Sequence, residues 1–336
     1  MILSITTPMP QRVVVTGGAG FIGSNIVHEL LDKGYVVNII DDLSTGRFEN
    51  IAPYVDRGEV NFYRGSILDC NLLKSAFRDA DYVLHQAALP SVQRSIENPR
   101  ATNDVNVTGT LNVLMMAKDA GVKKVVLASS SSVYGDTPVL PKVEDMKTNP
   151  KSPYAATKLM CENYGSSFTD IFNLPVACLR YFNVYGPNQN PNSNYAAVIP
   201  LFINAVLKNQ SPRINGDGSQ TRDFTYIKDV VDANLLAMKS SATGAFNIAY
   251  GSQVSIRALA EKIMDIVGNY PELKFIDARK GDVKDSLADI TRARNGFGYD
   301  PHYSLDRGLK ASVEWYESRS KVDICAPSKL MAVSTH

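Results

Sequence analysis

A phenol and an ammonium group stand four positions apart in the segment YAATK, which begins at Tyr154 and ends at Lys158. Residues at that spacing share one face of a helix, and Pro153 before them suits a first helical turn. A phenol ordinarily titrates at about pH 10, too high for a base at neutral pH, but an adjacent cation favours the phenolate. The pair could therefore remove a proton from a hydroxyl group. Tyr270 and Lys274 have the same spacing, but Pro271 lies between them, so we interpret this second pair as accidental.

Four consecutive serines, Ser129 to Ser132, follow an apolar run of strand length. Serine hydroxyls at the end of a strand can bind a substrate oxygen or satisfy backbone groups in a turn. We expect Ser130 to contact the substrate oxygen and to share the proton path with Tyr154. Ser131 is the second choice, and Ser129 and Ser132 are expected to satisfy the backbone.

A glycine motif near the start of the chain, TGGAGFIG, runs from Thr16 to Gly23. Gly17 permits a tight turn, Gly20 lets the backbone approach a pyrophosphate, and Gly23 allows close packing of helix on strand. Phe21 and Ile22 open the helix, whose N-terminal N–H groups would bind phosphate. Because the motif lies between a predicted strand and a predicted helix, it indicates a dinucleotide site.

An acidic residue ends the next predicted strand, as dinucleotide binding requires. Asp41 would accept hydrogen bonds from the adenosine ribose and repel a 2′-phosphate, and Asp42 adds to that repulsion. NAD is therefore favoured over NADP. Further cofactor contacts are expected after later strands, at Ser66, Ile67, Gln86, Ala87 and Ala88. For Asn106, a cofactor contact and a role in helix packing are equally plausible.

Alternating strand and helix patterns predict the fold. Strands are expected at 12–16, 36–41, 60–64, 82–86, 125–129 and 176–181, with helices at 21–33, 72–77, 99–120 and 153–172. This βαβ alternation predicts an α/β fold with a doubly wound parallel Rossmann sheet. After residue 182 the pattern changes to short strands (212–214, 245–248, 273–276) and helices (199–208, 256–267, 305–318). We expect a Rossmann domain over 11–182, a smaller C-terminal α/β lobe over 183–320, and tails at 1–10 and 321–336.

Composition excludes several classes of function. The net charge of +1 gives no basic surface for nucleic acid, and no apolar run is long enough to span a membrane. The four cysteines and four histidines lack the spacing of metal sites or disulfides, so no metal is expected. Free thiols favour a cytoplasmic location, and residues 1–10 lack the features of a signal peptide.

These motifs resemble those of extended short-chain dehydrogenase/reductases that act on nucleotide sugars. The resemblance is strongest to UDP-hexose 4-epimerases, particularly the branch that accepts N-acetylated sugars. It covers residues 11–318, and the segments that carry it are TGGAGFIG, DDLSTG, HQAALPSVQRSIENP, SSSSVYGD, SPYAATK, LRYFNVYGP, NGDGSQTRDFTYIKD and RKGDVKDSLADI.

The resemblance implies further site residues and an assembly. It implies cofactor contacts at Ser44, Thr45, Gly46 and Tyr181, with Tyr181 near the nicotinamide. It implies that Asn183, Arg222 and Arg279 hold the UDP diphosphate, and that Ala197 and Ser286 lie on the sugar side of the site. Read alone, either arginine would be a surface charge and Ser286 a polar loop residue. A homodimer through helices near 99–120 and 154–172 is also implied.

The implied reaction is epimerisation at C4 of UDP-GlcNAc/UDP-GalNAc, and of UDP-Glc/UDP-Gal, through a transient 4-keto sugar with NAD regenerated in each cycle. Related 4,6-dehydratases carry an Asp-Glu pair where this chain has Ser131 and Ser132. A UDP-glucuronate 4-epimerase or decarboxylase is the alternative enzyme. A non-enzymatic NAD-sensing regulator is the third reading, although such proteins typically lose the catalytic tyrosine or lysine.

Overall fold

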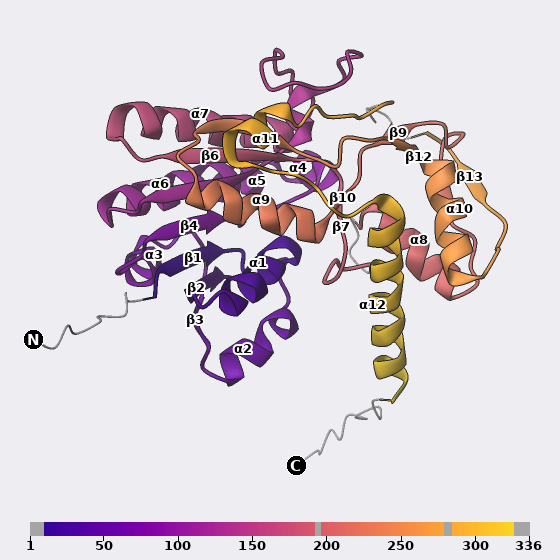
Figure 1. The fold of residues 1–336 in the computed structure, drawn as a ribbon, viewed down its shortest axis with the longest axis horizontal. Helices are drawn as coiled ribbons and strands as arrows, with labels where there is room; N and C mark the ends of the chain where they lie inside the picture. The colour runs from indigo at the N-terminus through magenta and orange to yellow at the C-terminus, as the bar shows by residue number, and fades with distance from the viewer. Residues whose placement is uncertain (1–9, 192–195, 279–283, 326–336) are drawn as a thin grey trace, which may run out of the picture.

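The computed structural model describes residues 10–191, 196–278 and 284–325, with side chains of the last helix described as far as Arg319. Its centre is a seven-stranded parallel sheet with the order β11-β6-β5-β4-β1-β2-β3 (Figure 1). The strands are β1 (Arg12–Thr16), β2 (Val36–Asp41), β3 (Val60–Arg64), β4 (Tyr82–His85), β5 (Lys124–Ser130), β6 (Val176–Tyr181) and β11 (Gly244–Ile248).

The strand order reverses beside β1, since β2 and β3 extend the sheet to one side and β4, β5 and β6 to the other. In open α/β sheets a ligand binds outside the carboxyl ends of the strands at such a reversal. The predicted doubly wound Rossmann fold is confirmed.

Helices cover both faces of the sheet, because successive residues of β1 place apolar side chains on opposite faces. Val13 and Val15 belong to one buried apolar cluster and Val14 to the other, as expected when side chains alternate along a strand buried on both sides. On one face α1 (Phe21–Asp32) packs beside α9 (Ile227–Lys239), and the other face carries α3 (Cys70–Ala76), α6 (Gly109–Asp119) and α7 (Pro153–Phe172).

Two elements that follow residue 182 belong to the central sheet or pack on it, although the sequence pattern assigned this part of the chain to the smaller lobe. Strand β11 pairs in parallel with β6, and α9, which the sequence pattern did not single out, packs on β4, β5 and β6. The sequence of a short strand does not indicate which strand it pairs with. Its position in the chain among lobe elements therefore suggested the wrong partner for β11. The domain boundary at 183 stays a prediction, but the sheet draws on residues beyond it.

The helix expected over 99–120 is interrupted. It consists of α5 (Pro99–Asn103), a π-helical turn (Asp104–Thr108) and α6. A single π turn inserts one extra residue per turn and commonly occurs near functional sites. At the other end of the chain, α12 (Leu305–Cys325) continues beyond the predicted end at Ser318 into the expected tail.

The remaining elements form the smaller lobe and the connections. Three two-stranded sheets pair β7 (Val184–Tyr185) with β10 (Thr225–Tyr226), β9 (Thr221–Arg222) with β12 (Val254–Ser255), and β8 (Arg213–Asn215) with β13 (Lys274–Ile276). Helices α8 (Val198–Leu207), α10 (Ile256–Val267) and α12 pack together beside them. Shorter helices are η1 (Phe48–Asn50), α2 (Ala52–Asp56), α4 (Val92–Glu97), η3 (Ser131–Tyr134) and α11 (Thr291–Phe297).

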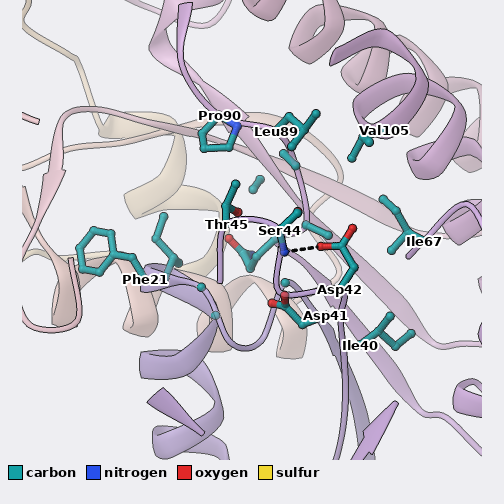
Figure 2. Close-up of a pocket in the computed structure, with 18 of the residues that line it drawn as sticks. Phe21, Ile40, Asp41, Asp42, Ser44, Thr45, Ile67, Leu89, Pro90 and Val105 are labelled. Atoms are coloured by element: carbon teal, nitrogen blue, oxygen red, sulfur yellow. Dashed lines mark hydrogen bonds between the residues drawn. The ribbon is translucent and has the colours of Figure 1, made fainter. Parts of the chain in front are cut away.

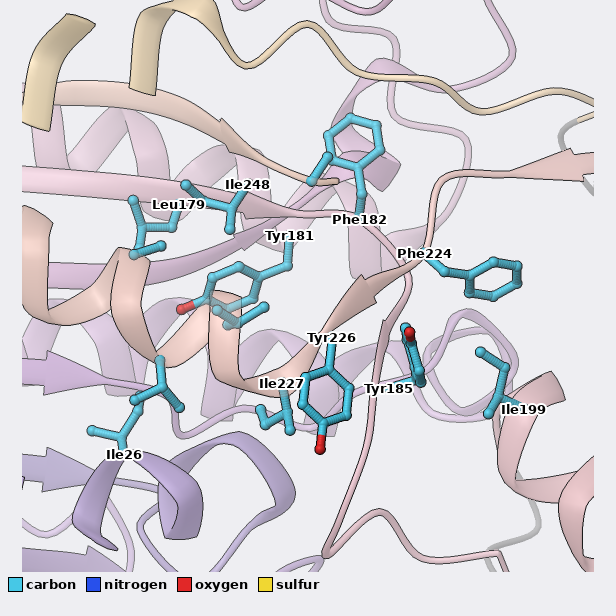
Figure 3. Close-up of a cluster of buried hydrophobic side chains, with 14 of the residues drawn as sticks. Ile26, Leu179, Tyr181, Phe182, Tyr185, Ile199, Phe224, Tyr226, Ile227 and Ile248 are labelled. Carbon is cyan, nitrogen blue, oxygen red and sulfur yellow. The ribbon is translucent and has the colours of Figure 1, made fainter. Parts of the chain in front are cut away.

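Buried aromatic side chains connect the sheet to the lobe. Tyr181 and Phe182 continue from the end of β6, and Tyr185, Phe224 and Tyr226 lie beyond them toward α8 (Figure 3). The ring centroids of Tyr185 and Tyr226 are 5.5 Å apart in an edge-on arrangement. This continuous core fixes the lobe against the carboxyl edge of the sheet, where the predicted site lies.

Candidate active site

A cavity of about 240 Å³ opens at the carboxyl edge of the sheet (Figure 2). Sixteen of the predicted residues line it together: Gly17, Gly20, Phe21, Ile22, Gly23, Asp41, Ser44, Thr45, Ser66, Ile67, Gln86, Ala87, Ala88, Tyr154, Lys158 and Tyr181. Sequence reasoning missed other members, including Asp42 as a lining residue, Gly65, Leu89, Val105 and Ser129. Most of these follow strand ends, which was the available signal.

The glycine motif forms a turn that packs tightly against the protein's own backbone. Gly17 has φ +68°, and an added Cβ would lie 2.7 Å from the backbone nitrogen of Ala87. At Gly23 an added Cβ would lie 2.0 Å from the carbonyl oxygen of Gly17. Neither position accepts a side chain, because the obstructing atoms are backbone. The first turn of α1 has no acidic side chain, so its N-terminal N–H groups face the cavity without a competing anion.

Asp41, the residue expected to bind the ribose, lies at the end of β2 as predicted. Its carboxylate accepts hydrogen bonds from the backbone nitrogens of Ala19 (2.9 Å) and Leu43 (2.8 Å). Gly46 does not line the cavity but packs on this carboxylate, since an added Cβ there would lie 2.8 Å from Asp41 Oδ1. Burial raises the pKa of Asp41, against the two backbone hydrogen bonds that lower it.

Tyr154 and Lys158 lie in the first turns of α7, which packs on β5 and β6, whereas Asp41 ends β2 on the other side of β1. The helix begins where predicted because Ser152 caps it, accepting from the backbone nitrogen of Ala155 at 3.2 Å. The buried Lys158 donates from Nζ to the carbonyl oxygen of Ala128 (2.8 Å), and Nζ lies 5.9 Å from the centre of the Tyr154 ring. The ammonium is therefore fixed beside the phenol, as the helical spacing predicted.

The hydroxyl groups of the serine run have different hydrogen-bond partners from those expected. Ser129 does not serve the backbone with its hydroxyl; it donates to the buried carboxylate of Glu162. The Oγ of Ser130 accepts from the backbone nitrogen of Ser132 (3.2 Å) and lies 2.9 Å from Ser132 Oγ. Ser130 ends β5 in register with Tyr181. Ser131, the second choice for the substrate contact, opens η3. Ser129 lines the cavity and Ser130 does not, so the expected contact between Ser130 and the substrate stays a prediction.

A buried ion pair anchors the catalytic helix to the sheet. Glu162, one further turn along α7, accepts two hydrogen bonds from the Arg180 guanidinium, at 2.7 and 2.9 Å. The two side chains are 8% and 5% exposed. Arg180 also donates to the Tyr134 hydroxyl (2.8 Å), which donates to Asn247 on β11 (2.7 Å). This network joins α7 to β5, β6 and β11 and so fixes the position of Tyr154.

Two polar residues at the same edge support the cavity. The Tyr181 hydroxyl lies between Gln86 Oε1 and Asn234 Oδ1, both at 3.1 Å, and burial raises the pKa of Tyr181. It therefore stays a hydrogen-bond donor and not a base. Asn106 does not line the cavity: it accepts from the backbone nitrogen of Leu89 (2.7 Å) and donates to Thr157 on α7 (3.1 Å). Asn106 thus holds the lining segment in place, which favours the packing alternative.

A second cavity of about 230 Å³ lies in the smaller lobe, and three predicted substrate residues line it: Asn183, Ala197 and Arg222. Asn183 donates from Nδ2 to the carbonyl oxygen of Asp223 (2.8 Å), and Arg222 donates to the carbonyl oxygen of Thr221 (2.8 Å). Sequence reasoning missed further lining residues with polar or aromatic side chains, namely Tyr185, Arg213, Asn215, Gln220 and Phe224. Their short strands gave no periodic signal.

Three predicted substrate residues within the described part of the chain line neither cavity: Ser130, Ser131 and Ser286. Arg279 lies outside the described residues. Ser286 is half-buried, and its backbone nitrogen donates to the carbonyl oxygen of Thr221 (3.2 Å), next to Arg222. Ser286 lines neither cavity among the described residues, so its contact with the sugar stays a prediction.

The NAD dependent epimerase/dehydratase family model matches residues 13–249, which include the glycine motif, the serine run and the Tyr154–Lys158 pair. The chain belongs to this family. It is 40% identical to "UDP-glucose 4-epimerase" of Mycolicibacterium smegmatis over 93% of this chain and 100% of that protein. It is 35% identical to "UDP-glucuronate 4-epimerase" of Thermodesulfobacterium geofontis over 94% and 99% of the two chains.

A solved structure extends the likeness to three dimensions. The UDP-N-acetylglucosamine 4-epimerase from Methanobrevibacter ruminantium, in complex with UDP-N-acetylmuramic acid, is similar with a TM-score of 0.89 and 41% identity, over 92% of this chain and 99% of that one. These findings confirm the resemblance to extended short-chain dehydrogenase/reductases of the UDP-hexose 4-epimerase type.

The family uses NAD, and the first cavity fits it. Gly17, Gly20 and Gly23 line it at the start of α1, whose N-terminal N–H groups would hold a pyrophosphate. Asp41, which also lines it, would accept hydrogen bonds from the ribose hydroxyls. No group of three or more His, Cys, Asp or Glu side chains that could hold a metal ion occurs among the described residues. Within the same part of the chain, no helix is both long and apolar enough to cross a membrane.

Proposed function

We propose that this enzyme interconverts UDP-hexoses that differ at C4, with NAD retained through the cycle. The observation that carries the proposal is the pairing of two cavities: one joins Asp41 to the Tyr154–Lys158 pair, and the other contains Asn183 and Arg222. A dinucleotide fits the first and a nucleoside diphosphate fits the second. The names of the relatives support the same reaction.

Each catalytic residue has one role in the proposal. Tyr154 removes the proton from the C4 hydroxyl, and Lys158, fixed by the carbonyl oxygen of Ala128, stabilises the phenolate. NAD, when bound, accepts hydride from C4 and returns it. Ser130 binds the C4 oxygen of the 4-keto sugar. After the sugar has turned in the pocket, Tyr154 returns the proton, which gives the C4 epimer.

UDP stays anchored while the sugar turns. Asn183 and Arg222 hold the diphosphate, together with Arg279, since arginine binds phosphate oxygens through paired hydrogen bonds. Arg222 is half-buried among backbone carbonyl oxygens that orient its guanidinium. Anchoring of UDP places C4 near the base in both halves of the cycle, which is the positional part of catalysis.

The N-acetylated sugars UDP-GlcNAc and UDP-GalNAc are proposed substrates beside UDP-Glc and UDP-Gal. Small side chains at Ala197 and Ser286 leave room for an acetamido group, and the similar structure from Methanobrevibacter ruminantium is named for UDP-N-acetylglucosamine. The relative named for UDP-glucuronate makes a UDP-glucuronate 4-epimerase the second candidate.

We further propose a cytoplasmic homodimer. The outer sides of α6 and α7 expose large apolar side chains, among them Met115 (44%), Met160 (44%) and Ile171 (68%). Such side chains in one region favour a protein interface. Among the described residues, the cysteines Cys70, Cys161 and Cys178 are free thiols, which favours a reducing compartment.

One experiment tests the reaction and separates the alternatives. Purified protein is incubated separately with UDP-Glc, UDP-GlcNAc and UDP-GlcA without added cofactor, and the products are assigned by NMR. We expect UDP-Gal and UDP-GalNAc from the first two. Product from UDP-GlcA alone would favour the second candidate, and no conversion of any substrate, with NAD bound, would favour the NAD-sensing regulator.

A further inference from the structure

A large cleft lies away from both cavities of the proposed reaction. Its volume is about 770 Å³, and it lies between the loop that carries Arg47 to Asn50, the segment 188–191, α8 and the outer turns of α12. Figure 1 shows α12 beside α8, with α6 and α7 at the opposite side of the molecule. We call it the amide cleft, because five asparagines and one glutamine line it: Asn50, Asn188, Gln189, Asn190, Asn204 and Asn269.

Hydrogen bonds within the protein occupy the side-chain nitrogens of three of these amides, which leaves their side-chain oxygens as acceptors. Asn50 donates from Nδ2 to the carbonyl oxygen of Ala19 (2.9 Å), and Asn269 donates from Nδ2 to that of Val206 (3.1 Å). Gln189 donates from Nε2 to the carbonyl oxygen of Val184 (3.2 Å). A carbonyl oxygen can only accept, so the nitrogen of each amide is assigned without ambiguity.

Among the described residues, the side-chain oxygen of Gln189 lacks a hydrogen-bond donor, which lowers the stability of the fold. Gln189 Oε1 is buried, and within the described part of the chain it has no hydrogen-bond partner. A buried acceptor without a donor typically costs about 1–3 kcal/mol. Its neighbour Tyr316 donates to the backbone oxygen of Gln189 (2.5 Å), not to the side chain. Because Gln189 Oε1 is buried, a ligand in the cleft would instead meet the side-chain oxygens of Asn50 and Asn269, which can accept from a ligand that carries several donors.

Aromatic rings and charges narrow the class of ligand further. Trp315 and Tyr316 line the cleft with ring centroids 4.9 Å apart, and the guanidinium of Arg319 lies 5.3 Å from the Trp315 centroid. Lining side chains include three basic residues and two acidic ones, so a cation is not favoured. A sugar ring has both features that this lining would bind: hydroxyl groups that donate to amide oxygens, and C–H faces that pack on aromatic rings.

We propose that the amide cleft is a second, non-catalytic binding site for a neutral saccharide. Its volume is within the range of small-molecule sites, about 300–1,000 Å³. The site would also communicate with the cofactor loop: the backbone nitrogen of Arg47 and the side chain of Asn50 both donate to the carbonyl oxygen of Ala19, whose own nitrogen donates to Asp41. A saccharide in the cleft would brace this loop.

Trp315 is the only tryptophan of the chain, so its fluorescence reports on the cleft directly. NAD-loaded protein is saturated with UDP, which fills the proposed substrate site, and is titrated with glucose, N-acetylglucosamine and maltose. At least one sugar should change the fluorescence saturably, on the order of millimolar concentration. No saturable change with any of the three, together with no heat of binding by calorimetry, would overturn the proposal.

Variants locate the binding by calorimetry. Asn204→Ala removes a half-buried cleft amide that makes no side-chain hydrogen bond within the described part of the chain, and it should weaken binding about 2- to 10-fold. Trp315→Leu should weaken it about 2- to 12-fold, and Trp315→Phe should restore most of it. Asn71→Ala, an exposed asparagine on α3, is the matched control and should bind as the unmodified protein does. Unchanged affinity in both Asn204→Ala and Trp315→Leu would place the sugar elsewhere and overturn the proposal.

Discussion

Removal of the Arg180 guanidinium should destabilise the fold far more than removal of the whole ion pair. Arg180→Met leaves the Glu162 carboxylate buried, with the Ser129 hydroxyl as its remaining donor. A buried charge that loses its partner typically costs about 3–5 kcal/mol. We therefore expect the free energy of unfolding to fall by about that amount.

The double variant Arg180→Met/Glu162→Leu removes both charges. Its remaining cost comes from groups that lose a partner, mainly the Ser129 hydroxyl and the carbonyl oxygen of Glu144, which accepts from Arg180 at 3.2 Å. At about 1 kcal/mol for each hydrogen bond, the double variant should lose about 2 kcal/mol, less than the single one. The Tyr134 hydroxyl keeps its bond to Asn247 in both variants.

The assay is equilibrium unfolding in urea, followed by circular dichroism at one fixed concentration of NAD for all variants. Turnover should also fall in Arg180→Met, because the ion pair fixes the helix that carries Tyr154. The reasoning is refuted if the single variant loses less than about 1 kcal/mol, or if the double variant is less stable than the single one.

Three further predictions concern the site. Tyr154→Phe keeps the ring and loses the proton-transferring oxygen, so kcat should fall about 100-fold or more with UDP-sugar binding kept, while Tyr270→Phe should be silent; near-normal turnover of the first would exclude the base. Burial raises the pKa of Asp41, so the contribution of Asp41 to the free energy of unfolding is present in acid and is lost as pH rises through the raised pKa. NAD retention should strengthen over the same rise in pH, because the carboxylate that binds the ribose forms. Dialysis across that range tests this, and Asp41→Asn should flatten the dependence. Ser286→Tyr should suppress turnover of UDP-GlcNAc far more than of UDP-Glc in competition assays, and equal losses would contradict the proposed pocket.

The parts of the site that depend on local sequence could be predicted. The glycine turn, Asp41 at the end of β2 and the Tyr154–Lys158 pair on α7 each lie where residue spacing placed them, because strand ends and helical turns fix side chains over a few residues. The family resemblance supplied Asn183 and Arg222, which the local pattern alone would have left on the surface.

Long-range pairing could not be predicted. No local feature indicates that β11 pairs with β6, or that Ser129 donates to a carboxylate on α7, 33 positions later. The π turn at Asp104–Thr108 and the cleft between α8 and α12 likewise depend on tertiary packing. The same limit explains why the residues of the second cavity, which come from several two-residue and three-residue strands, were only partly found.

The central claim is that hydride leaves C4 and returns to the same carbon through cofactor that never leaves the protein. The most direct test uses UDP-glucose carrying deuterium at C4, incubated with purified protein in ordinary water without added NAD, and follows the label by NMR and mass spectrometry. The proposed cycle predicts UDP-galactose that retains deuterium at C4, and NAD released in near-equal amount on denaturation. Loss of the label to water, or a requirement for added NAD in proportion to product, would contradict it.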